Sequence, residues 1–173
     1  MLTEYQQIEG DLIESGSMEG FEYASYRFGA EVLHRIRAVG PIGLKERLPL
    51  YRALARLSPS GALFLILDNH QRHENTFSTE DMDAIVTVLK AGGIIDFHGA
   101  TVTHDPDYGK IGKLANARFS LSGIGGQVIV TADPEEAELF MREMLSARAA
   151  GRDEGGKARG DGKTLPDLLP DQE

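Results

Sequence analysis

The chain has 173 residues, of which 41% are hydrophobic and 26% are charged, so it can build one globular domain with a full core. Its formal net charge of -9 disfavours a nucleic-acid backbone as partner, and the absence of cysteine excludes disulfides and thiol nucleophiles. No stretch approaches the roughly 20 apolar residues of a membrane span, and the start shows no signal-peptide pattern. We therefore expect a cytoplasmic protein that does not span a membrane.

Three regions of different composition follow one another along the chain. Residues 1–18 are acidic and poor in apolar anchors, so we expect a flexible acidic arm there. Residues 19–147 carry the periodic apolar patterns of a single α/β domain. Residues 148–173 are rich in glycine and in charge, and they are expected to form a disordered tail.

The domain begins with a pattern that is typical of a β-hairpin. Strand-like runs cover residues 21–28 and 31–39, and Gly29 separates them. A helical pattern then covers residues 44–57, with leucine, tyrosine and alanine side chains on one face. Because Pro49 lies inside this pattern, we expect the helix to begin close to Pro49 or to bend there.

Basic residues gather in the same part of the chain. They can receive an acidic partner, including the acidic segment at the start of this chain, or they can simply form the solvated face of a helix. The set comprises Arg35, Arg37, Lys45, Arg47, Arg52 and Arg56.

The most informative segment joins a buried strand to a capped helix. Five consecutive apolar residues, 63–67, are typical of a central strand that is covered on both faces, and Asp68 marks the point where this strand meets water. Ligand sites of open α/β sheets lie at this carboxyl edge. Ser78 or Thr79 is expected to cap the next helix, and Ser78 with Asp81 fits a capping box.

The rest of the domain alternates between strands and helices. A strand is expected over residues 94–103, a helix after Asp105, a short strand over residues 127–131, and a last helix that opens at Asp133-Pro134. The predicted order is ββαβαβαβα, with about five strands in a layered α/β domain.

Histidines are the candidate metal ligands, although no zinc motif accompanies them. His70 and His73 are three residues apart and Glu74 follows, whereas His98 and His104 lie on one face of a predicted strand. We expect no metal and no cofactor, with His70, His73 and His104 as weak candidates, because neither a HExxH spacing nor a cysteine is present. A pocket lined by all four histidines would suit a small-ligand carrier or an enzyme.

Hydroxyl groups near the start of the capped helix are candidates for a regulatory switch. A phosphate on Thr76, Ser78 or Thr79 would lie near a helix N-terminus, which favours negative charge. Simple helix capping explains the same residues without a switch.

Four features together resemble one known family. They are a strand leading to Gly40, a proline-containing helix over residues 44–57, the strand 63–68, and the acidic helix start at residues 133–138. This pattern, over roughly residues 21 to 147, resembles the STAS superfamily, and in particular its SpoIIAA-like branch. The resemblance implies a small mixed sheet with helices mainly on one face, and binding of partner proteins instead of catalysis.

In bacterial members of that family the loop after the Asp-terminated strand presents a phosphorylatable hydroxyl. The matching loop here is longer and rich in histidine, and it lacks a Ser-Ser-Gly-like turn. We predict a non-enzymatic regulatory module that binds another protein, with a homodimer as a further expectation. The alternative is a small-molecule or lipid carrier, or an enzyme with a histidine-lined pocket. The predicted contact residues are Asp68, Asn69, His70, His73, Glu74, Thr76, Ser78 and Thr79, with Ser78 and Thr79 as the phosphorylation candidates.

Overall fold

The computed structural model of the protein describes residues 8–158. Within them the strands are β1 (Asp11–Met18), β2 (Phe21–Phe28), β3 (Glu31–Ala38), β4 (Ile42–Gly43), β5 (Ala62–Asp68), β6 (Asn75–Thr76), β7 (Asp96–Val102) and β8 (Gly125–Thr131). The helices are α1 (Leu44–Arg56), α2 (Thr79–Ala91), α3 (Tyr108–Leu121) and α4 (Pro134–Ala158). None of the described helices combines the length and apolar character that a bilayer crossing requires.

The strands form a mixed sheet, so the predicted α/β class is confirmed. The strand order is β1-β2-β3-β5-β7-β8; the first three strands are antiparallel, and β3, β5, β7 and β8 run parallel. This sheet has six strands instead of about five, and β4 and β6 form a separate parallel pair. The expected order misses β1 and these two short strands.

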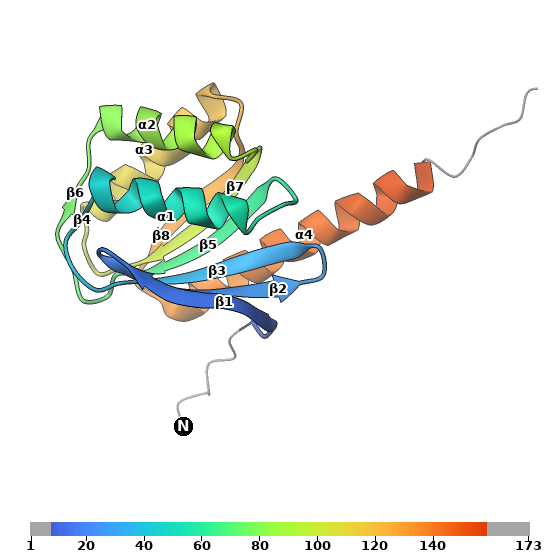
Figure 1. Ribbon diagram of the computed structural model, residues 1–173, viewed down its shortest axis with the longest axis horizontal. Helices are drawn as coiled ribbons and strands as arrows, with labels where there is room; N and C mark the ends of the chain where they lie inside the picture. The colour runs from blue at the N-terminus through green and yellow to red at the C-terminus, as the bar shows by residue number, and fades with distance from the viewer. Residues whose placement is uncertain (1–7, 159–173) are drawn as a thin grey trace, which may run out of the picture.

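Helices cover both faces of the sheet, as Figure 1 shows. On one face α1, α2 and α3 pack against Leu63, Leu65 and Leu67 of β5. On the other face α4 packs against Phe64 and Ile66. Three of the four helices therefore share one face, as expected, and α4 explains why the apolar run in β5 is uninterrupted.

The prediction of a flexible acidic arm over residues 1–18 is wrong for residues 11–18, because these residues form β1 at the edge of the sheet. Pairing with β2 uses backbone groups, so it does not require the apolar side chains that the segment lacks. Residues 1–7 lie outside the described part of the chain.

Acidic side chains from β1 and from the turn and strand after it pair with members of the basic set; of the three, Glu14 lies in the segment 1–18 that one reading of the sequence paired with these residues. Glu14 lies 3.9 Å from Arg56, and Glu19 lies 3.1 Å from Lys45. Glu22 also forms an ion pair with Arg37. Because most of these side chains are exposed to water and to screening by salt, the pairs add little to the stability of the fold.

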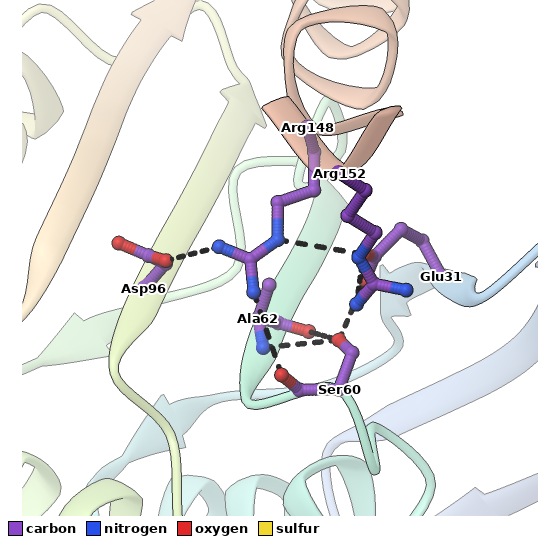
Figure 2. Close-up of polar contacts among 6 residues, drawn as sticks. All are labelled: Glu31, Ser60, Ala62, Asp96, Arg148 and Arg152. Carbon is purple, nitrogen blue, oxygen red and sulfur yellow. Dashed lines mark hydrogen bonds and ion pairs between the residues drawn. The ribbon is translucent and has the colours of Figure 1, made fainter. Parts of the chain in front are cut away.

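The tail expected to be disordered from Arg148 is helical up to Ala158, and residues 159–173 lie outside the description. Figure 2 shows the reason. Arg148 donates to the Asp96 carboxylate at 2.6 Å, and Arg152 lies 2.8 Å from the carboxylate of Glu31. These ion pairs join the helix to two strands that are far away in the sequence, and the Glu31 side chain is only 6% exposed.

The helix α1 begins at Leu44, five positions before Pro49, so the expectation that it begins close to Pro49 is wrong. The carboxylate of Glu46 accepts a hydrogen bond from the Gly43 amide at 2.8 Å, and this contact fixes the first turn. Pro49 lies inside α1, and the helix continues beyond it to Arg56.

One polar network lies inside the core between β2, β3 and the end of α1. The His34 ring is fully buried, with Nδ1 2.7 Å from the Ser25 hydroxyl and Nε2 2.7 Å from the Ser58 hydroxyl. Since Ser58 donates its hydrogen to the Leu54 carbonyl, Nε2 of His34 must be the donor to Ser58. Burial lowers the pKa of His34 to about 4, so the ring is neutral at pH 7.

The outer edge of β8 is closed by a side chain. The Asn116 carboxamide on α3 donates to the Val128 carbonyl at 2.8 Å and accepts from the Val128 amide at 2.7 Å. These are the backbone groups that a further strand would use at this point. Asn116 therefore occupies the middle of this edge.

Candidate functional site

The loop between β5 and α2 stands at the carboxyl edge of the parallel strands. Its first residue, Asn69, is buried and its amide donates to the Val102 carbonyl at 2.8 Å. The Asn69 side chain then closes a turn, because it accepts from the His73 amide at 3.1 Å and donates to the His73 carbonyl at 3.3 Å. An asparagine in this position orders the loop backbone.

Two further contacts hold the middle of the loop. Arg72 adopts a left-handed backbone with φ of 56°, and its guanidinium donates to the His104 carbonyl at 2.9 Å. After this turn the Glu74 carbonyl accepts from the Ile42 amide at 2.8 Å, next to the pairing of β6 with β4. The loop is thus attached on one side to the segment after β7 and on the other side to β4.

Most of the predicted contact residues point to solvent from this ordered backbone. Asp68 and His73 are half-buried, and Asn69 is buried. The exposed members are His70, Glu74, Thr76, Ser78 and Thr79.

The predicted capping box at the start of α2 is confirmed. The Ser78 hydroxyl accepts from the Asp81 amide at 3.2 Å, and the Asp81 carboxylate accepts from the Ser78 amide at 2.9 Å. Ser78 is the N-cap and Thr79 is the first helical residue. The role of these hydroxyls as phosphorylation sites stays a prediction.

The histidines of the loop take part in local contacts. Nδ1 of His70 lies 2.6 Å from the Asp68 carboxylate, and Nε2 of His73 lies 3.1 Å from the Gln71 side chain. Across residues 8–158, no group of three or more histidine, cysteine, aspartate or glutamate side chains is arranged to hold a metal ion.

The structure does not bring His98 together with the other three histidines. His98 lies in the first half of β7 and stacks on Phe64, with ring centroids 4.9 Å apart, on the face that α4 covers. Burial lowers its pKa, an effect that Asp96 partly opposes. The prediction of one pocket lined by all four histidines is therefore wrong. His98 lies near the start of β7 on the face that α4 covers, whereas His70, His73 and His104 lie beyond the carboxyl ends of the strands.

A residue outside the predicted site lies directly beneath the loop. The Arg47 side chain on α1 is 5% exposed and lies under the Phe77 ring, with its guanidinium carbon 5.2 Å from the ring centroid. It donates to the Tyr108 hydroxyl at 2.7 Å, to the Tyr51 hydroxyl at 3.3 Å and to the side-chain amide oxygen Oδ1 of Asn75 at 3.1 Å. Arg47 is therefore not part of a solvated basic face.

A small cavity of about 60 Å³ extends from this arginine between the sheet and helices α1, α2 and α3. Its wall is largely apolar, and Arg47 is its one charged residue. Members of the wall include Leu65, Leu67, Phe77, Met82, Phe97 and Phe119.

No protein-family model matches the chain, and no curated protein matches it. A solved structure with some similarity is a crystal structure of an uncharacterised protein of the DUF3478 family from Shewanella loihica PV-4, which is described as having a SpoIIAA-like fold. The two chains are 14% identical, and the match covers 74% of this chain and 98% of that one with a TM-score of 0.44.

Proposed function

We propose that the protein is a non-enzymatic regulatory module that binds another protein through the loop of residues 69–79 and the first turn of α2. The observation that carries this proposal is the order of the loop, whose backbone is held by Asn69, by Arg72 and by the pairing of β6 with β4. A loop that is already ordered loses little conformational entropy when a partner binds to its exposed side chains.

Regulation of this surface would act through Ser78. The hydroxyl is exposed and lies at the N-terminus of α2, where backbone amides favour a negative charge. Glu80 and Asp81 lie within one turn, so a phosphate would also make an acidic surface more acidic. Partner binding would then change while the fold stays intact.

The test compares Ser78→Asp with the native protein in capture of partners from extracts of its own cells. Aspartate is a good N-cap, so the melting temperature should change little while the loop gains a charge. Ser146→Asp is the matched control, because Ser146 is exposed on α4, which covers the opposite face of the sheet.

The expected result is a set of captured proteins that changes with Ser78→Asp and stays constant with Ser146→Asp. Chemical cross-linking of the captured protein should map to residues 69–79. Capture that is the same for all three proteins, or cross-links that map elsewhere, would contradict the proposal. Native mass spectrometry of the same samples tells whether the partner is a second copy of the chain.

A further inference from the structure

The Arg47 guanidinium is a buried charge without an acid to neutralise it. Its partners among residues 8–158 are two tyrosine hydroxyls and one amide oxygen, all of them neutral. Other arginines of the chain pair with carboxylates although they are more exposed; Arg148, which is 24% exposed, is an example. Leaving a charge buried and unpaired is costly, so the site is electrostatically incomplete.

Several hydrogen-bond donors around Arg47 lack an acceptor within the described residues. Nε of Arg47 and Nδ2 of Asn75 are buried and make no hydrogen bond. Each of the Tyr51 and Tyr108 hydroxyls accepts from Arg47, and neither donates its own hydrogen to any described residue. Buried donors of this kind are normally satisfied, so their presence together indicates an acceptor that the chain does not supply.

We propose that the cavity beside Arg47 is a binding site for a small monocarboxylate with a short hydrocarbon chain. The carboxylate accepts from Arg47 and from the Tyr51 and Tyr108 hydroxyls, and the hydrocarbon chain lies in the apolar part of the cavity. An apolar wall with one cationic end does not suit a sugar, a nucleotide or a metal ion, which require many polar groups.

The size of the cavity limits the ligand to a few carbon atoms. A volume of about 60 Å³ is roughly four times the 15 Å³ that one water requires on this measure. Phe77 lies over the guanidinium and is only half-buried, so this ring stands between the charged end of the cavity and water. Butyrate is therefore a suitable first probe.

The experiment measures the melting temperature of the native chain against butyrate, with butyramide as the neutral isostere and butylammonium as the cation. Butyrate should raise the melting temperature by about 8 °C at a concentration 100-fold above its dissociation constant, because it binds the folded state alone. Butyramide and butylammonium should have no such effect, because they cannot neutralise the guanidinium.

Variants test the residues that hold the carboxylate. Arg47→Met should abolish the butyrate shift, and Arg52→Met is the matched control because Arg52 is exposed on the same helix. Tyr108→Phe keeps the arginine and removes one donor, so it should weaken butyrate binding about tenfold even if Arg47→Met fails to fold.

Three results would overturn the proposal. The first is the absence of a saturable rise in melting temperature with acetate, butyrate and hexanoate up to about 10 mM. The second is a rise with butyramide equal to that with butyrate. The third is unchanged butyrate binding in both Arg47→Met and Tyr108→Phe. The cavity lies beneath the proposed interaction surface, because Arg47 contacts Asn75 and Phe77 of the same loop, but the two proposals have separate tests. Partner capture that survives in Arg47→Met leaves that surface standing, and loss of capture in Ser78→Asp does not affect butyrate binding.

Discussion

The buried His34 ring should make the protein lose stability as the pH falls from about 6.5 to about 4. In the unfolded chain the imidazole titrates at its ordinary pKa of 6.5, whereas burial lowers its pKa to about 4 in the folded protein. Within this window the unfolded chain binds a proton that the folded protein does not, so acid favours unfolding. The shift corresponds to about 3 kcal/mol, which is fully present above pH 6.5 and lost at pH 4.

The assay is urea unfolding at pH 7, 6, 5 and 4 for the native protein and for His34→Gln, which cannot titrate at this position. Carboxylates contribute equally to both proteins, so they cancel in the difference between the two curves. The native protein should lose about 3 kcal/mol more than the variant between pH 7 and pH 4. Parallel curves would refute the reasoning, as would an NMR titration of the folded His34 ring with a midpoint near 6.5.

Two predictions concern the contacts that complete the fold. Asn116→Ala removes two hydrogen bonds to Val128, so it should lower the free energy of unfolding by about 2 kcal/mol. It should also increase self-association in sedimentation experiments, whereas the exposed control Lys113→Ala should not. An unchanged sedimentation profile would show that Asn116 does not protect this edge. Arg148→Met leaves Asp96 without its arginine and leaves the buried Glu31 with Arg152 and the Ser60 hydroxyl as partners. The free energy of unfolding in urea should therefore be about 2 kcal/mol lower than that of the exposed control Lys90→Met. Equal stability of the two variants would mean that α4 is held by its apolar contacts alone.

The parts of the fold that depend on local sequence were predictable. The apolar run of residues 63–67 predicts a central strand, and β5 is found there. Ser78 and Asp81 form the predicted capping box because a helix cap depends on residues that are adjacent in sequence. The loop between β5 and α2 could be located because both the end of the strand and the start of the helix are visible in the local sequence.

The parts that were missed depend on distant contacts. β1 has few apolar side chains, and it becomes ordered by backbone pairing with β2. The end of α4 is rich in glycine, and it becomes ordered through ion pairs with Glu31 and Asp96. Composition alone cannot reveal either contact, because the partner segments are specified elsewhere in the chain.

The burial of Arg47 had only an ambiguous signal in the sequence. It lies three, four and seven residues before Leu50, Tyr51 and Leu54, which places it on the apolar face of α1. An arginine on such a face usually extends its charge to water at the rim. Its depth here depends on Tyr108, which is 61 residues away and becomes a neighbour only when α3 packs.

The position of α4 sets an order of events during synthesis of the chain. The apolar side chains of β5 and β7 on that face, including Phe64, Ile66 and Ala100, leave the ribosome before the helix that covers them. Until α4 emerges, a nascent chain with a formed sheet presents one uncovered apolar face, which is the kind of surface that chaperones bind. Folding of this protein should therefore be completed late in translation, when residues of α4 become available to close the second layer.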